Sequence, residues 1–300
     1  MSRRIMTVSK RLKMGLIGDN ISRTRLPAAL KIMCNEHNLG FSFTPIDSAI
    51  EDTFDFDMTL SRIIAEGWDG VTVTHPFKLD AARAAGDHAP LGADGVRLAA
   101  SNLLTFTDPI KAYNTDYSGF IHMWLSLSCT SPGQVAMAGA GGVASAIGPA
   151  LIELGADSII IWDIEKSRAE DLASLLGPKA HAIDHHDAAQ ACFKADGLVN
   201  ATSLGMAGYG GTAFEPDWLS QASWAFDAVY TPNKTPFLIT ARAAGLTCIS
   251  GFSLFKSMAI ETFKTYTGLP LHQNDIYRKL ETLRPLDESA EMSLMNEGIQ

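Results

Sequence analysis

The sequence predicts an α/β protein with two domains, and three observations support this prediction. The chain has 300 residues, which is longer than one typical domain and long enough for two hydrophobic cores. Segments with the period of strands alternate with segments of helical period, with no internal repeat or low-complexity tract. In the second half a strand, a glycine-rich turn, a helix and another strand follow one another, as at the start of a dinucleotide-binding fold. The alternation favours parallel sheets covered by helices.

The first domain is predicted to begin with a strand, a helix and a strand. Residues 14–19 (MGLIGD) and 41–47 (FSFTPID) have the composition of strands. A helical pattern covers residues 27–40 between them, and its last residue, Gly40, suits the C′ position just beyond a helix. This pattern makes the first 110 or so residues one α/β unit.

A further strand, preceded by a helix over 59–67, ends just before Lys78. Val71 and Val73 alternate with threonines, which is typical of a half-buried strand, and Pro76 ends the strand because it has no N–H to donate. In open α/β sheets ligands bind outside the carboxyl ends of the strands, so Lys78 stands where a ligand-binding side chain is expected. The alternative is a solvated lysine that opens a helix.

The second domain is predicted to follow the polar loop at 128–134. Residues 135–156 form a short apolar strand, a glycine turn and a helix in this prediction, and residues 158–163 form the next strand. Helices over 253–268 and 273–283 close the chain, and we expect them to pack back on the first domain.

Composition limits the class of protein and its partners. Hydrophobic residues at 46% and charged residues at 19% are typical of a soluble globular protein. The net charge of −9 argues against nucleic acid and anionic membranes, since neutralising phosphates requires clustered lysine and arginine. The four cysteines form no C-x-x-C pair, which argues against a zinc knuckle or a redox dithiol and suits the cytoplasm. We expect a small-molecule partner, and a monomer or homodimer.

The basic N-terminus lacks the apolar core of a signal peptide, and no apolar run is long enough to span a membrane. We interpret it as a flexible extension, with a transit peptide as the alternative.

The glycine-rich turn predicts a nucleotide site. Gly139, Gly141 and Gly142 permit a tight turn, let the backbone approach a pyrophosphate and aim the N–H groups of the helix at the anion. Asp163 ends the next strand 24 residues after Gly139, where a carboxylate binds the ribose hydroxyls of NAD and repels a 2′-phosphate. This favours NAD over NADP as the cofactor. The alternative for Asp163 is a helix cap.

Two more polar segments follow predicted strands. Asn114, Thr115 and Asp116 are adjacent, and taken alone they indicate an Asx turn. The segment 198–206 (LVNATSLGM) passes from an apolar strand into a small polar loop. Together with Lys78, these loops at strand ends beside one nucleotide fold suggest a cleft between the domains.

Six ordered stretches now show a resemblance: GVTVTHPFK, ASNLL, YNTDYSGF, GAGGVASA, NATSLGM and AVYTPNKTPFL. Over roughly residues 14–270 the chain resembles the shikimate dehydrogenase family, and most of all its NAD-dependent quinate/shikimate branch. The resemblance implies an N-terminal substrate domain, a C-terminal Rossmann domain, and reversible hydride transfer between a polyol carboxylate such as shikimate or quinate and a nicotinamide. We expect the following division: an extension at 1–12, the substrate domain at 13–112, the Rossmann domain at 113–250, C-terminal helices at 251–290 and a tail at 291–300.

The resemblance also implies residue roles. Lys78 matches the catalytic lysine and Asp116 its partner aspartate. The expected substrate-binding residues are Ser22, Thr24, Thr74, Asn102, Tyr230 and Met258. The expected cofactor-binding residues are Gly139, Ala140, Gly141, Gly142, Val143, Asp163, Arg168, Asn200, Ala201, Thr202, Met206, Val229 and Gly251. No metal is expected, because His181, His185 and His186, which could form a cluster, lie away from these motifs.

Alcohol oxidation explains why a lysine is needed. It releases a hydride to nicotinamide C4 and a proton to a base within hydrogen-bond reach of the hydroxyl. We therefore expect Lys78 to be the acid/base and Asp116 to orient the hydroxyl. Burial favours the neutral form of a lysine and a nearby carboxylate favours the charged form, and the sequence leaves open which effect prevails.

The chain departs from the family pattern at several positions. The family holds the substrate carboxylate with two hydroxyl residues before a proline, and counting back from Pro27 gives Thr24 and Leu26. If two residues are inserted, Ser22 and Thr24 supply both hydroxyls. Leu103 follows Asn102 where the family has threonine. The family's His-Asn pair becomes Leu30 and Lys31, and its substrate-binding glutamine becomes Met258.

Two other functions therefore stay open. One is a divergent relative that acts on another cyclic polyol or an amino analogue. The other is a nucleotide-binding sensor without catalysis, since Rossmann folds host many functions. The presence of both Lys78 and Asp116 argues against the sensor, because binding alone needs no acid/base group.

Overall fold

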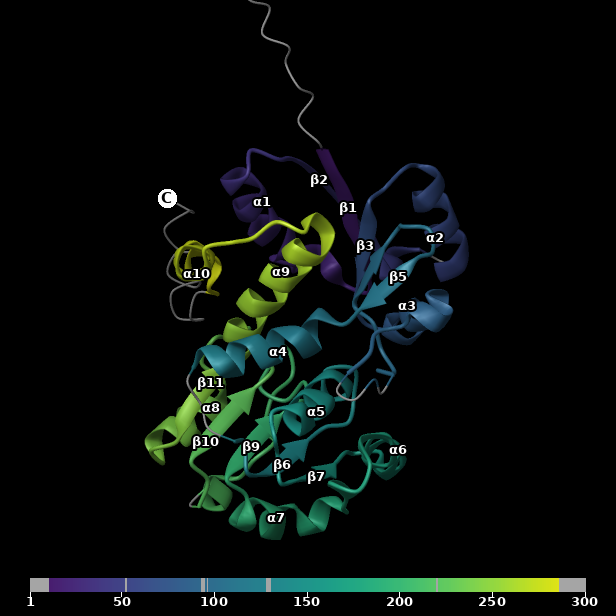
Figure 1. Ribbon diagram of the computed structural model, residues 1–300. Helices are drawn as coiled ribbons and strands as arrows, with labels where there is room; N and C mark the ends of the chain where they lie inside the picture. The colour runs from purple at the N-terminus through teal and green to yellow at the C-terminus, as the bar shows by residue number, and fades with distance from the viewer. Residues whose placement is uncertain are drawn as a thin grey trace, which may run out of the picture. The chain divides into compact units, whose positions relative to one another are not determined.

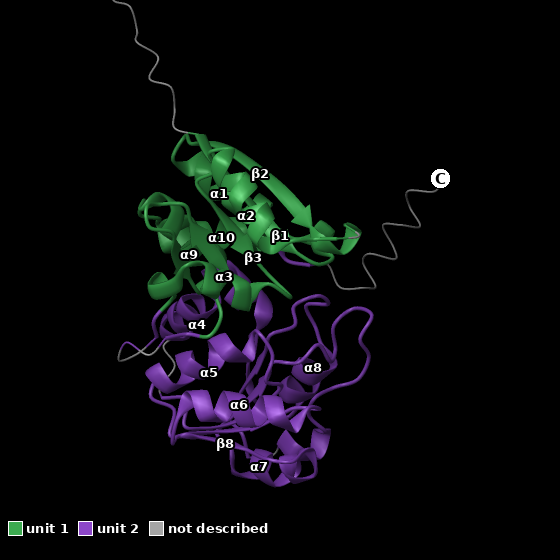
Figure 2. Cartoon of the chain, turned by 90° about the vertical axis from the view of Figure 1, so that its right-hand side faces the viewer, with its two compact units in different colours: residues 1–90, 99–115, 259–283 green, residues 91–98, 116–258, 284–300 purple. Residues whose placement is uncertain are grey.

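The structure is a computed structural model that describes residues 11–51, 53–92, 95, 97–127, 131–219 and 221–285. The predicted tail, Cys129 and all but two residues of the predicted extension lie outside these ranges. The chain forms two compact units, coloured separately in Figure 2. The described residues of unit 1 lie within 1–90, 99–115 and 259–283, and those of unit 2 within 91–98, 116–258 and 284–300. The boundaries expected at 112 and 250 stay predictions.

Unit 1 contains a five-stranded sheet in the order β2-β1-β3-β4-β5 (Figure 1). Its strands are β1 (Arg11–Gly18), β2 (Gly40–Asp47), β3 (Gly70–Val73), β4 (Leu103–Thr105) and β5 (Lys111–Tyr113). The first three run parallel, whereas β4 is antiparallel to β3 and β5 is antiparallel to β4. The prediction of parallel strands is therefore confirmed for β1, β2 and β3 and wrong for β4 and β5. The loop between β4 and β5 is too short for the crossover that a parallel pair requires.

Apolar helix faces cover the unit 1 sheet. The described helices are α1 (Leu26–Glu36), α2 (Phe56–Ala65), α3 (Lys78–Ala84), α10 (Gln273–Leu280) and the second half of α9 (Gly251–Thr267). On α2, Phe56, Leu60 and Ile63 are spaced by one helical turn and pack against Val71 and Val73 of β3.

Helix α1 ends earlier than the sequence pattern predicts. Its last residue is Glu36, and Asn38 adopts the left-handed conformation with φ 51°. Gly40 already opens β2, so the prediction that Gly40 is the C′ residue is wrong. Asparagine tolerates the left-handed region because its short amide can bond locally, and it makes the turn here.

Unit 2 contains a six-stranded sheet in the order β11-β10-β9-β6-β7-β8, with every neighbouring pair parallel. The strands are β6 (Gln134–Ala138), β7 (Ser158–Trp162), β8 (Ala180–Ala182), β9 (Gly197–Asn200), β10 (Trp224–Asp227) and β11 (Thr247–Ser250). Counted from its first strand the order is 3-2-1-4-5-6, which is the Rossmann order. This confirms the predicted α/β class with a Rossmann fold in the second half of the chain.

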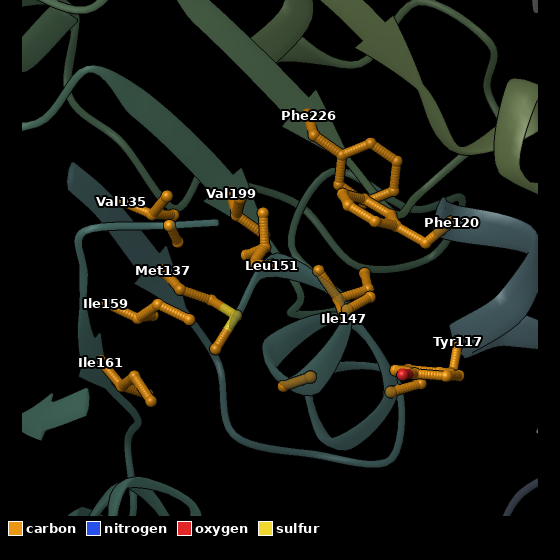
Figure 3. Packing of buried hydrophobic residues seen from close by; sticks show 14 of the residues in the cluster. Tyr117, Phe120, Val135, Met137, Ile147, Leu151, Ile159, Ile161, Val199 and Phe226 are labelled. Atoms are coloured by element: carbon orange, nitrogen blue, oxygen red, sulfur yellow. The ribbon is translucent and has the colours of Figure 1, made fainter. Parts of the chain in front are cut away.

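Helices cover both faces of the unit 2 sheet. They are α4 (Thr115–Ser126), α5 (Ala144–Glu153), α6 (Lys166–Leu176), α7 (Ala188–Lys194), α8 (Pro236–Ala243) and the first half of α9. Figure 3 shows one core, in which Met137 and Val199 of the sheet pack with Leu151 of α5. On the other face, Phe237 of α8 and Cys192 of α7 share a second core. Within the described ranges, no helix is both long and apolar enough to cross a membrane.

Candidate active site

Four strands of the unit 2 sheet end side by side. Ala138 of β6 pairs with Asn200 of β9, Asn200 pairs with Asp227 of β10, and Asp227 pairs with Ser250 of β11. The loops after these strands therefore begin at the same edge. Predicted cofactor residues from four separate segments of the sequence gather there.

Two glycines of the turn after β6 are needed for different reasons. Gly139 has φ 94°, and a Cβ there would lie 2.8 Å from the carbonyl oxygen of Ala201, so only glycine fits. At Gly141 a Cβ would meet no protein atom within 4 Å. Helix α5 begins at Ala144, so its first N–H groups and this open space lie where a pyrophosphate would bind.

Asp163 lies beside the turn and is held by two backbone bonds. Its Oδ2 accepts a hydrogen bond from the Ala140 N–H at 2.7 Å, and its Oδ1 accepts one from the Glu165 N–H at 2.9 Å. The N-cap of α6 is Glu165, so the alternative that Asp163 caps this helix is wrong. The next residue, Ile164, is 99% exposed. The carboxylate is thus fixed at the turn, where it can meet a ribose.

Two cations that follow Asp163 in the sequence, Lys166 and Arg168, are paired with carboxylates. Arg168 Nε lies 2.5 Å from Glu165 Oε2, and Lys166 Nζ donates a hydrogen bond to Asp184 Oδ2 at 2.9 Å. That bond lowers the pKa of Asp184 and raises the pKa of Lys166. A 2′-phosphate at this place would have to compete with these partners.

A buried carboxylate that is not among the predicted site residues lies on the same edge. Asp227 is fully buried and accepts hydrogen bonds from Asn200 Nδ2 at 2.9 Å, from the Val229 N–H at 3.0 Å and from the Thr235 hydroxyl at 2.5 Å. Burial raises its pKa to about 6. The signal that could have found it is a lone acid at the end of the apolar strand WAFD.

Substitution of Asp227 tests this raised pKa. Between about pH 4 and 6 the native state keeps the proton that the unfolded state loses, so the free energy of unfolding falls as pH rises, by about 3 kcal/mol, and is level above that range. We expect Asp227→Asn to remove this slope, which urea unfolding across a pH series would show. An unchanged slope in the variant would contradict the assignment.

The predicted substrate residues of unit 1 lie at the carboxyl edge of its own sheet. Thr74 follows β3 and lies over Gly18, where a Cβ would be 2.2 Å from the Thr74 methyl group. The Asp19 N–H donates to the His75 carbonyl at 2.9 Å and joins the ends of β1 and β3. Lys78, half-buried, is the first residue of α3, and its carbonyl accepts a hydrogen bond from the Ser101 N–H at 2.9 Å.

Ser22 and Thr24 lie in the segment that follows β1. Ser22 is exposed in a short 3-10 helix (Ile21–Arg23), and Thr24 is half-buried just after it. Asp47 at the end of β2 holds this segment by accepting hydrogen bonds from the Asn20 and Ile21 N–H groups at 2.9 and 3.1 Å. Both predicted hydroxyls therefore lie near the carboxyl edge of the sheet.

Two of the leucines at positions where the family pattern has polar residues, Leu30 and, on one alignment, Leu26, have a structural role. Leu26 and Leu30 lie on the buried face of α1, with 5% and 0% of their surfaces exposed. They fill the core of unit 1, and a ligand cannot reach Leu30 without displacing its neighbours.

Asn102 is oriented by the start of α4. Its Oδ1 accepts hydrogen bonds from the Thr115 N–H at 2.7 Å and from the Thr115 hydroxyl at 3.1 Å, and that hydroxyl lies 3.1 Å from the Thr262 hydroxyl of α9. These bonds fix which side of the amide carries the oxygen. Among the described residues, no hydrogen-bond partner is found for Asn102 Nδ2, so it can donate to a ligand.

The predicted catalytic pair is distributed over the two units. Lys78 belongs to unit 1. Asp116 belongs to unit 2 and is the first residue of its range 116–258. Asp116 is half-buried in the first turn of α4, directly after Thr115, whose backbone N–H is held by Asn102. The roles of both residues stay predictions.

Tyr230 and Met258 belong to unit 2. Tyr230 stacks on Phe255 of α9 with ring centroids 5.6 Å apart, and Met258 is half-buried on the same helix. Packing alone requires a glycine at Gly251, a predicted cofactor residue, because a Cβ there would lie 2.2 Å from the Ala228 carbonyl oxygen.

The histidine segment brings three possible ligand groups together on the surface of unit 2. Single ligand atoms of Asp184, His186 and Asp187 lie within 4.8 Å of one another. The side chains of His186 and Asp187 are exposed, and Asp184 is already ion-paired to Lys166. Acidic groups on a surface commonly stand without a metal, so we assign none here.

The Rossmann unit, its glycine turn and the carboxylate beside it define a dinucleotide-binding α/β protein. No family model matches the chain. It is 30% identical over 266 residues to the quinate/shikimate dehydrogenase (NAD(+)) of Corynebacterium efficiens, covering 85% of this chain and 93% of the relative. It is 31% identical over 261 residues to the shikimate dehydrogenase (NADP(+)) of Maricaulis maris, covering 85% and 90%.

Solved structures agree with these relatives. The quinate dehydrogenase from Corynebacterium glutamicum in complex with NAD superimposes with a TM-score of 0.83 at 27% identity, over 91% of this chain and 99% of that one. The chain belongs to the quinate/shikimate dehydrogenase family, which consists of NAD(P)-dependent oxidoreductases that act on CH–OH groups. The resemblance seen in the sequence is confirmed.

Proposed function

We propose that the protein is a dehydrogenase that interconverts a ring hydroxyl of shikimate or quinate with a ketone and transfers the hydride to or from a nicotinamide. The observation that carries this proposal is the open space over Gly141 beside the fixed carboxylate of Asp163, in a chain of this family. The space suits a pyrophosphate and the carboxylate suits a ribose.

We propose NAD as the preferred cofactor. Asp163 is fixed where a 2′-phosphate would meet its negative charge, and Arg168 and Lys166 are paired with Glu165 and Asp184. Surface ion pairs are weak, about 0 to 1 kcal/mol each, so the carboxylate of Asp163 rather than the pairing is the main barrier to NADP. Relatives of both cofactor types are similar to the chain, so the preference rests on this geometry.

The glycine turn gives a test of the cofactor site alone. Gly141→Ala should fold as the wild type, since its Cβ meets no protein atom, but should raise the Kd for NADH by about tenfold, because the Cβ occupies the pyrophosphate space. Gly139→Ala should lower the Tm as well, because φ 94° and the Ala201 carbonyl exclude a side chain. NADH fluorescence titration and thermal melts separate the two effects. Unchanged NADH affinity in Gly141→Ala would contradict the site.

We propose that unit 1 binds the polyol carboxylate. Thr74 and Asn102 supply a hydroxyl and an amide donor for ring hydroxyls, and Ser22 and Thr24 supply hydroxyls for the carboxylate. With substrate and a nicotinamide bound, Lys78 Nζ would take the hydroxyl proton during oxidation and return it during reduction, and nicotinamide C4 would accept or supply the hydride. Asp116 orients the reacting hydroxyl by accepting its hydrogen bond.

Met258 bears on which substrate is preferred. A half-buried methionine offers no hydrogen bond, and a substrate hydroxyl left without a partner costs about 1 to 3 kcal/mol. We expect Met258→Gln to raise kcat/KM for shikimate or quinate by about tenfold. A low-micromolar wild-type KM for shikimate with no gain in the variant would show that the pocket finds its polar contacts elsewhere. A poor wild-type KM for both acids with turnover of another cyclic polyol would favour the divergent relative.

A rate screen tests the proposed function. Purified protein is mixed with shikimate, quinate and related polyols, each with NAD and with NADP, and the absorbance of the reduced nicotinamide is followed. We expect turnover with NAD and shikimate or quinate. Binding of NADH with no turnover of any polyol would favour the nucleotide-binding sensor. The cytoplasmic location and the monomeric or dimeric state stay predictions.

A further inference from the structure

A buried carboxylate joins two of the loops to which the cofactor is assigned. We propose that Asp227 is a positioning residue for the nicotinamide cofactor: it ties the loop after β9 to the loop after β10. The inference rests on the proposed function, since the ligand of these loops is part of that proposal.

The bonds of Asp227 reach three segments. It accepts hydrogen bonds from Asn200 Nδ2 on the β9 side and from the Val229 N–H on the β10 side. It also accepts one from the hydroxyl of Thr235, the N-cap residue of α8, and that hydroxyl accepts the Leu238 N–H. Val229 stands directly before Tyr230. One carboxylate thus fixes the starts of both loops.

Asn200 connects Asp227 to the loop that contacts the glycine turn. Its Nδ2 also donates to the Leu204 carbonyl at 3.1 Å, and its Oδ1 accepts from the Thr202 N–H at 3.0 Å and hydroxyl at 2.6 Å. The same loop closes over Gly139, whose missing Cβ would lie 2.9 Å from the Thr202 methyl group. Loss of the carboxylate would therefore loosen the loop that borders the pyrophosphate site.

Asp227 forms no ion pair within the described residues. The groups that face it from β9, from the loop after β10 and from α8 are an amide, a backbone N–H and a hydroxyl, all neutral, and in the described part of the chain no cation pairs with it. A buried, unpaired carboxylate lowers the stability of the fold. Its three bonds suit an acceptor that holds loops in place, which is how supporting groups around a site act.

Three variants test the proposal in the full-length protein. Asp227→Ala removes all three acceptor bonds. Asp227→Asn is the conservative control, because its Oδ1 can accept from Asn200 and Val229 while its Nδ2 donates to the Thr235 hydroxyl. Asp196→Ala is the matched control, because this exposed carboxylate accepts the Gln134 N–H at 2.8 Å at the opposite edge of the same sheet.

The readouts are the Kd for NADH by fluorescence, the KM for NAD against kcat, and the Tm. We expect Asp227→Ala to raise the Kd and the KM by about 10 to 100-fold, with a smaller change in kcat. Asp227→Asn should stay within about threefold of the wild type, and Asp196→Ala should lower the Tm without changing the Kd. If Asp227→Ala does not fold, Asn200→Ala, which breaks the same link from the loop side, should raise the Kd instead.

Wild-type NADH affinity in Asp227→Ala, or in Asn200→Ala where the first does not fold, would overturn the proposal. An equal loss of affinity in Asp196→Ala would also overturn it, because destabilisation alone would then explain the effect. The Kd is measured without substrate, so a protein that binds NADH but oxidises no polyol contradicts the proposed reaction and leaves this test valid. A wild type that does not bind NADH contradicts the cofactor site and this inference together.

Discussion

Lys78→Met is expected to lower kcat for polyol oxidation by roughly 10² to 10⁴-fold while the Kd for NADH stays near the wild-type value. Methionine keeps most of the length of the side chain but cannot accept the hydroxyl proton. Lys78 is the first residue of α3 and half-buried at the carboxyl edge of the unit 1 sheet. The glycine turn and Asp163 belong to the other unit, so cofactor affinity should not change.

The matched control is Lys111→Met. Lys111 is an exposed lysine of β5 in the same unit, so its loss changes the net charge equally and should leave kcat unchanged. Steady-state rates and NADH titrations on both variants measure the expected changes in kcat and in the Kd for NADH. Wild-type turnover in Lys78→Met would remove this lysine from the mechanism.

The double variant Asp163→Ser, Ile164→Arg is expected to shift the ratio of kcat/KM for NADP to that for NAD by roughly 10² to 10³-fold toward NADP. The serine removes the negative charge beside the glycine turn. The arginine supplies a cation for the 2′-phosphate at a position that is 99% exposed, so no packing is lost. A new charge-assisted hydrogen bond to the phosphate contributes about 1.5 to 3 kcal/mol, and removal of the repelling carboxylate has an effect of similar size.

Ile164→Arg alone is the control for this pair. It keeps the carboxylate that is bonded to the Ala140 and Glu165 N–H groups, so it should still prefer NAD. A single variant that already prefers NADP would show that the carboxylate does not set the choice. A wild type that uses NADP as well as NAD would contradict the role given to Asp163.

Much of the second unit could be predicted from the sequence because its signals are local. A strand, a glycine turn and an acid at the end of the next strand lie within 30 residues, and the Rossmann order follows from them. The antiparallel pair β4 and β5 was not predicted, because each strand is only three residues long. Such short segments show no clear two-residue period.

The residues missed at the site are those whose roles depend on distant partners. Asp227 is one acid in an apolar strand until the sheet aligns it with Asn200 and α8 brings Thr235 to its other oxygen. Thr262 meets Thr115 across 147 positions of sequence. Leu30 replaced a polar family residue in the sequence comparison, yet helix α1 turns its side chain into the core. No pattern within one element contains these contacts.

We propose that the protein moves a hydride from a ring carbinol carbon to NAD, with Lys78 accepting the proton. The most direct measurement uses quinate or shikimate that carries deuterium at the reacting carbon, with the reduced nicotinamide analysed by mass spectrometry. We expect NADH formed by the wild type to carry one deuterium at C4, and we expect Lys78→Met to form it at least about 10²-fold more slowly. Reduced nicotinamide without deuterium, or none from either acid, would contradict it.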